Sequence, residues 1–158
     1  MEEFDWTVNS DCYRNHELVG RDGKKHVLVG VSAFAHVGLT TCLSSVLQCS
    51  TLYTGIEGIH CPVVEWYFNP FADKNFEDTT PSPKSPNILI PTKERAIVEY
   101  MLLHEKFDEG ILIEGLKDYD YLNNGDWSKV YALAPKYLLK SYYVDYWIKE
   151  AREWDDDP

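Results

Sequence analysis

The spacing of hydrophobic positions changes near the middle of the chain. Before residue 91 the apolar residues come in short runs rich in β-branched and aromatic side chains, as is typical of strands. Runs of this kind stand at 26–31, 63–68 and 87–90. After residue 91 the apolar residues recur every three or four positions, which is typical of one helix face. The pattern predicts an α+β fold: a small mixed or antiparallel sheet from the N-terminal half, packed against a C-terminal helical cluster.

Residues that can cap a helix precede the helical segments. Thr92 follows Pro91 and precedes an amphipathic stretch, so a helix is predicted to begin there. Asp108 and Asp126 are predicted to cap the next two helices, and Pro135 to open the last one. The last helix carries a stripe of residues four apart, which we interpret as core, with two tyrosines beside it: Leu139, Tyr143, Trp147 and Ala151, then Tyr142 and Tyr146.

A shorter helix is predicted directly after the first strand. Ser32 is expected to cap it, and Gly38 can end it in a left-handed conformation. His36 lies among apolar neighbours and is interpreted as a hydrogen-bonded core histidine. The following stretch is ambiguous, since residues 43–49 suit a buried helix and 50–54 a strand.

The 158 residues fit a single domain of three sub-regions. Residues 1–68 are strand-rich, 91–154 are helical, and 69–90 between them combine a proline-rich loop with a short strand. There is no apolar run of transmembrane length and no cleavable leader, so we expect a cytoplasmic protein.

The four cysteines, Cys12, Cys42, Cys49 and Cys61, lack the paired spacing of a zinc knuckle or a redox motif. We interpret them as reduced thiols in a core. A zinc site built from Cys12, His16, His60 and Cys61 is the less favoured alternative. We therefore expect neither a metal nor another cofactor.

Charge argues against direct binding of nucleic acid. The chain has 15 Lys plus Arg against 26 Asp plus Glu, a formal charge of −11. No Lys or Arg occurs between Val27 and Asp73, so this stretch cannot supply cations for phosphates. An acidic surface can attract a basic protein or simply keep the protein in solution, and both interpretations remain open.

A search for catalytic motifs finds none of the common ones: no phosphate-binding glycine loop, no HExxH and no nucleophile elbow. Ser32 and His36 lie four residues apart on a predicted helix, which can bring a hydroxyl toward an imidazole. No third group that would orient the imidazole is evident. We expect no catalytic residues, although an enzyme remains an alternative, kinase-like or nuclease-like and acting against a toxin.

Two short motifs occur in a recognisable order. The first is Ser32-Ala33-Phe34-Ala35-His36-Val37-Gly38-Leu39, and the second runs from Ile90 to Glu99 and contains Glu94-Arg95-Ala96. With the helices that follow, this order resembles the common domain of the AbiEi-like antitoxins of prokaryotic type IV toxin–antitoxin systems, which act in phage defence.

The resemblance implies a protein that neutralises a cytoplasmic nucleotidyltransferase-type toxin by protein binding. Lys93, Glu94 and Arg95, which we expect to be exposed, are then the candidate contacts, and an intramolecular ion pair is the alternative role for Glu94 and Arg95. Family members usually begin with a winged-helix domain, whereas too few residues precede Val27 for one and no basic recognition helix is present. An acidic DNA-mimic inhibitor is a third hypothesis.

Overall fold

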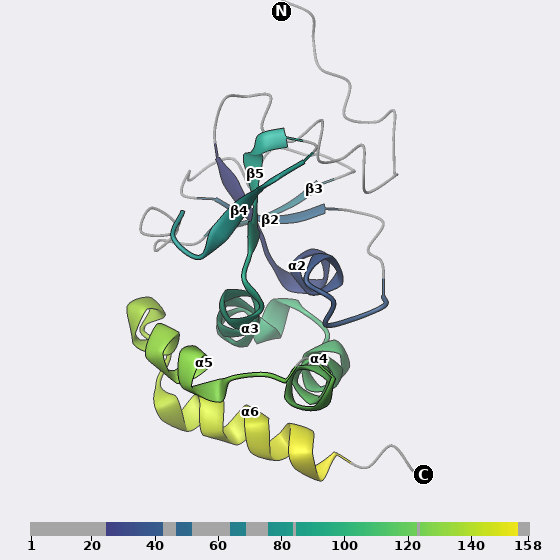
Figure 1. Ribbon diagram of the computed structural model, residues 1–158, viewed down its shortest axis with the longest axis vertical. Helices are drawn as coiled ribbons and strands as arrows, with labels where there is room; N and C mark the ends of the chain where they lie inside the picture. Colours follow the sequence, from purple (N-terminus) through teal and green to yellow (C-terminus); the bar gives the residue numbers. More distant parts are fainter. Residues whose placement is uncertain are drawn as a thin grey trace, which may run out of the picture.

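The computed structural model of the protein describes residues 25–42, 47–51, 64–68, 76–83, 85–122 and 124–154. A sheet lies at one end, two helices pack beneath it, and three further helices form the other end (Figure 1). This arrangement confirms the predicted α+β fold.

Five strands form a mixed sheet in the order β3-β2-β1-β5-β4. Their bounds are β1 His26–Leu28, β2 Leu47–Thr51, β3 Val64–Phe68, β4 Thr79–Ser82 and β5 Ser85–Pro91. β1 is parallel to β5 and antiparallel to β2, whereas β2 is parallel to β3 and β4 is antiparallel to β5. The strands predicted at 26–31, 63–68 and 87–90 are therefore present, the first of them shorter than expected.

Strand β4 lies within the segment that we predicted to be a loop. Pro81 stands opposite Leu89 of β5, and the register shifts between Pro81 and Ser82. Proline is tolerated here because β4 is at the edge of the sheet, where a missing N–H need not interrupt an inner ladder. The prediction of a loop was wrong for residues 79–82, and residues 69–75 of that segment lie outside the described part of the chain.

Helix α2, Gly30–His36, begins two residues earlier than Ser32. Gln48 of β2 replaces the expected cap, since its side-chain Oε1 accepts hydrogen bonds from the Val31 N–H at 2.8 Å and the Ser32 N–H at 3.4 Å. In return, the Ser32 hydroxyl oxygen accepts the Gln48 N–H at 2.9 Å. Gly38, with φ of +79°, follows the helix as predicted. Gln48 and Cys49 lie in β2, so the helical interpretation of 43–49 was wrong there.

The helical half contains α3 Lys93–Leu102, the 3₁₀ turn η3 His104–Lys106, α4 Glu109–Tyr121, α5 Trp127–Leu133, the 3₁₀ turn η4 Ala134–Tyr137 and α6 Ser141–Glu153. Three caps are those predicted. The Thr92 hydroxyl accepts the Arg95 N–H, and the carboxylates of Asp108 and Asp126 accept N–H groups of α4 and α5.

The last helix begins later than predicted. Pro135 opens the short turn η4, and Leu138 at φ of +56° then interrupts the helical path before α6 begins at Ser141. Proline fits the first turn, but it does not determine how far a helix continues.

An aromatic cluster joins the sheet to the helices. The rings of Phe34 and Tyr100 stack with centroids 4.5 Å apart, and Phe107 follows at 5.0 Å from Tyr100. Gly115 of α4 lies directly against Phe34, because a Cβ there would stand 2.4 Å from the ring. α2, α3 and α4 therefore share one core.

Several sequence-based interpretations fall outside the described residues. They concern Cys12, His16, His60 and Cys61, and with them the zinc alternative. Of the other two cysteines, Cys49 is buried as expected, whereas Cys42 is exposed. In the part of the chain that the structure covers, no group of three or more His, Cys, Asp or Glu could hold a metal ion, and no helix is long and apolar enough to cross a membrane.

Candidate partner-binding surface

Arg95, which we expected to be exposed, is completely buried. Its Nε and Nη2 donate to Glu99 Oε1 at 3.0 and 2.9 Å, and its Nη1 donates to the Glu77 carbonyl oxygen at 3.0 Å. The guanidinium also lies 5.8 Å from the ring centroid of Tyr137. The exposure predicted for Arg95 was wrong. Arg95 forms its ion pair with the buried Glu99, one helical turn further along α3, and not with Glu94.

Glu99 is an ionisable group deep in the core. Burial raises the pKa of the Glu99 carboxyl above its ordinary value, and the charge and hydrogen bonds of Arg95 act in the opposite direction. Arg95 donates both to the Glu99 carboxylate and to the Glu77 carbonyl oxygen. It therefore links α3 to the turn before β4.

Glu94 lies near the surface, at a junction organised by Tyr119. The Tyr119 hydroxyl accepts the Asp126 N–H at 2.8 Å, and it has one proton to donate, either to Glu94 Oε2 or to the Asp126 carbonyl, each also 2.8 Å away. Burial raises the pKa of Tyr119, so the phenol stays protonated at neutral pH. The junction holds Glu94 of α3 beside the loop that joins α4 to α5, and Lys93 is half-buried next to it.

Replacing Tyr119 with Phe removes this hydroxyl, so the Asp126 N–H loses its hydrogen-bond acceptor. We expect Tyr119→Phe to lower the free energy of unfolding by about 1–3 kcal/mol, the usual cost of a lost partner for a partly buried polar group. Urea denaturation measures the change. Tyr121→Phe is the matched control: that hydroxyl is on an exposed ring, and we expect an effect within about 0.5 kcal/mol. Equal losses for both variants would show that the junction does not stabilise the fold.

The pairing considered for Ser32 and His36 is not the one observed. His36 is exposed, not in the core, and its Nδ1 donates to the Ser32 carbonyl oxygen at 2.8 Å. The Ser32 hydroxyl, in turn, accepts the Gln48 N–H. Both side chains therefore serve the local structure of α2 in these contacts.

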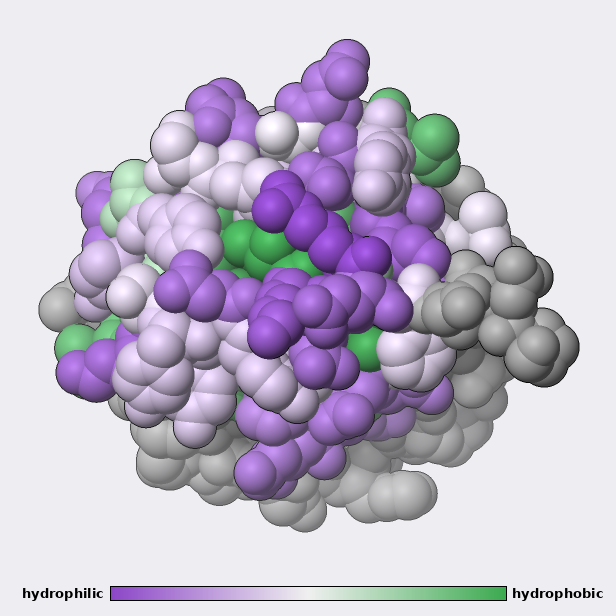
Figure 2. All heavy atoms as spheres, turned by 90° about the horizontal axis from the view of Figure 1, so that it is seen from below, coloured by the Kyte–Doolittle hydropathy of each residue, from purple (hydrophilic) through white to green (hydrophobic). Residues whose placement is uncertain are grey.

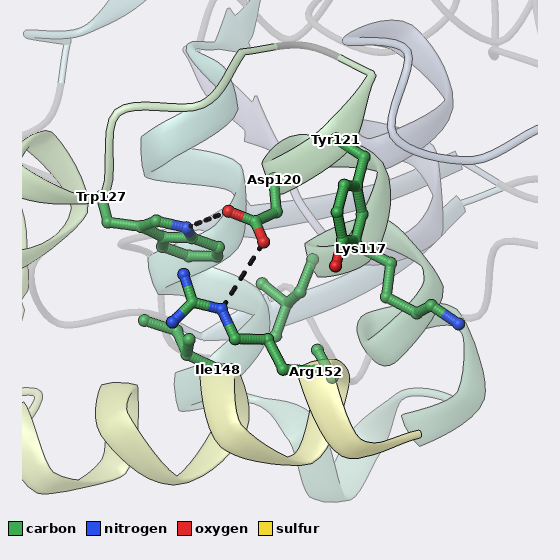
Figure 3. Close-up of a pocket in the computed structure, with 8 residues that line it drawn as sticks. Lys117, Asp120, Tyr121, Trp127, Ile148 and Arg152 are labelled. Atoms are coloured by element: carbon green, nitrogen blue, oxygen red, sulfur yellow. Dashed lines mark hydrogen bonds and ion pairs between the residues drawn. The ribbon is translucent and has the colours of Figure 1, made fainter. Parts of the chain in front are cut away.

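A small pocket between α4, α5 and α6 is held together by polar contacts. Figure 3 shows Asp120 between Trp127, whose Nε1 donates to it at 2.9 Å, and Arg152, whose Nε lies 3.5 Å from Asp120 Oδ2. The volume is about 10 Å³, which is room for about one water molecule. This pocket cannot hold a substrate, and its contacts fasten α6 to α4.

Acidic residues are concentrated around α4. Between residues 105 and 126, seven carboxylates stand against two lysines, a net charge of −5 out of the −11 of the whole chain. Glu114, Asp118, Tyr121 and Leu122 follow one another at helical spacing on the outward side of α4, and we call these four residues the α4 surface. Tyr121 is 69% and Leu122 76% exposed.

A second exposed surface lies on α6, where we had interpreted the aromatic stripe as core. Leu139, Trp147 and Ala151 are indeed buried, but Tyr143 of the same stripe is 45% exposed, and Tyr142 and Tyr146 beside it are 62% and 52% exposed. Tyr142, Tyr146, Lys149 and Glu153 share one outward side at helical spacing, and we call them the α6 face. In Figure 2, which views the molecule from its α6 side, hydrophilic side chains surround a small hydrophobic area.

Neither surface was predicted from the sequence, and the reasons differ. The aromatic residues of α6, Tyr142, Tyr143, Tyr146 and Trp147, lie on one broad side of the helix, so periodicity alone does not say how much of that side meets the core. The excess of acidic residues at 105–126 was visible in the sequence and is the signal that could have located the α4 surface.

The fold and these surfaces define an α+β protein with exposed aromatic and acidic side chains on its helical half. A comparison with protein-family models and one with curated proteins find no match.

Proposed function

We propose that this protein is an antitoxin-like inhibitor that binds a basic surface of a cytoplasmic nucleotidyltransferase-type toxin through its α4 surface. The observation that supports the proposal most is the joint presence of a net charge of −5 around α4 and two exposed apolar side chains, Tyr121 and Leu122.

The two features have complementary roles in binding. Carboxylates attract a cleft that is built for nucleotide or tRNA phosphates and speed the encounter with it. Exposed aromatic and aliphatic side chains provide the apolar contact that most interface energy comes from. Glu94 and Lys93 lie close to the end of α4 through the Tyr119 junction and stay candidate contacts. Arg95 is not a candidate contact, because its side chain is buried.

The test is a pull-down of the tagged full chain from its native cytoplasm at low and at high salt, with bound proteins identified by mass spectrometry. We expect a nucleotidyltransferase-type protein that is released as salt rises, since salt screens contacts between exposed charges. Recovery of nucleic-acid-binding proteins of other kinds instead would favour the DNA-mimic hypothesis.

Charge-reversal variants locate the surface. The double variant Glu114→Lys, Asp118→Lys is expected to weaken capture of the toxin by about tenfold or more, because like charges then face each other. Glu77→Lys is the matched control, since Glu77 is an exposed carboxylate in the turn before β4, away from α4. Equal capture by the double variant and the control would rule out the α4 surface as the binding site.

A further inference from the structure

The α6 face is less acidic than the α4 surface, because its Lys149 and Glu153 cancel in charge. Helix α6 carries three carboxylates and two cations, a net charge of −1, whereas α4 carries four carboxylates and one lysine, a net charge of −3. Two molecules that each carry −11 repel one another, so copies of this chain approach with less repulsion through the α6 face than through the α4 surface. Among the described residues, α6 also carries the most exposed tyrosine rings: Tyr142, Tyr143 and Tyr146.

From this combination we infer that the α6 face is the contact between two antiparallel copies of this chain. A two-fold axis makes such a contact from the same surface of both copies. Each contact between two residues therefore occurs twice in the pair. The inference rests on residues of α6, none of which belongs to the α4 surface.

The order of residues along α6 suits such a pair. If the axis passes at the middle of the helix, near residue 147, residues of the two copies meet where their numbers add up to about 294 or 295. Lys149 of one copy then lies opposite Asp145 and Tyr146 of the second copy. Arg152 lies opposite Tyr142. Both cations meet a tyrosine ring, and one also meets a carboxylate, which gives cation–π and ionic contacts at each end.

A groove beside the α6 face can bind a side chain of the second copy. It has a volume of about 320 Å³ and is open to solvent, and it is lined by Tyr131, Asp145, Ile148, Lys149, Arg152 and Glu153. Its floor contains the nearly buried Ile148, and the Tyr131 hydroxyl donates to Asp145 at its edge. Burial first and Asp145 second raise the pKa of Tyr131 to about 12, so this hydroxyl keeps its proton at neutral pH.

Tyr142 is the residue that fits the groove. In the antiparallel arrangement it lies opposite Arg152 and Glu153, both of which line the groove. Arg152 is more than half exposed, and its pair with Asp120 at 3.5 Å leaves the guanidinium at the surface. An aromatic ring seated in a pocket is the usual anchor of an interface. A single helix of 13 residues covers less than the roughly 1,200 Å² of a standard interface, so we expect a weak, concentration-dependent dimer.

Sedimentation equilibrium of the full chain over a range of concentrations and salt tests the inference. We expect a monomer–dimer equilibrium that shifts toward dimer as salt rises, because the overall repulsion between two molecules of −11 is larger than the attraction of the exposed Lys149–Asp145 pairs, and salt screens both. This dependence is opposite in sign to that of toxin binding, so the two proposals can fail separately. A chain that stays monomeric at high salt and high concentration would overturn the inference.

Two complementary variants test the pairing itself. Lys149→Glu places two carboxylates opposite each other at both ends, and Asp145→Lys places two cations there, so each variant alone is expected to dimerise about tenfold more weakly or worse. In an equimolar mixture every contact is attractive again, and a mixed dimer is expected to form. Lys129→Glu, an exposed site on α5 with the same change of charge, is the control and should dimerise as the unmodified chain does. No mixed dimer, or equal weakening by the control, would contradict the antiparallel contact.

Discussion

Replacing Arg95 with Met is expected to lower the free energy of unfolding by about 3–5 kcal/mol, since breaking a buried ion pair leaves the other charge uncompensated. Glu99 would then stay in the core without its guanidinium, and the Glu77 carbonyl oxygen would lose its donor. Urea denaturation at neutral pH, followed by circular dichroism, measures the loss. The double variant Arg95→Met, Glu99→Leu removes both charges and is expected to recover most of it, because apolar residues of similar volume often replace such a pair at little cost.

The pH dependence of the same variant checks the cause. A carboxyl whose pKa is raised in the folded state contributes stability that is complete below its unfolded pKa and is lost as pH rises through the folded pKa. Burial already raises the pKa of Glu99, and removing Arg95 takes away the charge that opposes this. The stability difference between Arg95→Met and the unmodified protein should therefore shrink as pH falls from neutral toward the raised pKa. A difference that stays constant or grows toward acid pH would mean that the loss does not come from the Glu99 charge.

Gly30→Ala is expected to be the most damaging single-methyl addition among the glycines with positive φ. Gly30 has φ of +62°, and a Cβ there would lie 2.6 Å from Gln48 Oε1 and 2.8 Å from the Phe107 ring. The left-handed conformation costs an L residue about 1–2 kcal/mol, and the crowding adds about 1–3 kcal/mol. Gln48 cannot move away freely, because the same oxygen accepts the first amides of α2.

Gly38 supplies the matched control for this prediction. Its φ of +79° is also left-handed, but an added Cβ would meet no atom within 4 Å. Gly38→Ala should therefore cost the backbone term alone, about 1–2 kcal/mol. Thermal and urea denaturation of both variants separate the two terms. Equal losses would show that Gln48 and Phe107 adjust without cost.

The sequence predicted features that depend on a few neighbouring residues. Thr92, Asp108 and Asp126 each cap the helix that follows them, because a side-chain oxygen and an N–H two or three residues later suffice. Gly38 ends α2 in a left-handed conformation for an equally local reason.

Features that depend on distant parts of the chain were missed. Gln48 of β2 accepts a hydrogen bond from the Val31 N–H of α2, 17 positions away. Neither Gln48 nor Val31 predicts this contact from its sequence neighbours. Arg95 and Glu99 have the spacing of a surface pair one helical turn apart, yet both are buried because the turn before β4 and η4 cover them. Tyr142, Tyr143 and Tyr146 were assigned to the core because of their helical spacing, yet all three are exposed, and only the packing of α6 against α4 decides which side is covered. The acidic concentration around α4 could be counted in the sequence, but its combination with exposed Tyr121 and Leu122 needed the structure.

The edge strand β4 has a consequence for how the protein avoids aggregation. An open strand edge is a template on which another chain can add by backbone hydrogen bonds, and amyloid grows in this way. β4 is short, contains Pro81 without an N–H to donate, and shifts its register at the next residue. These are devices by which natural sheets discourage such growth. At this edge of the sheet, fibril-like stacking of copies is therefore disfavoured.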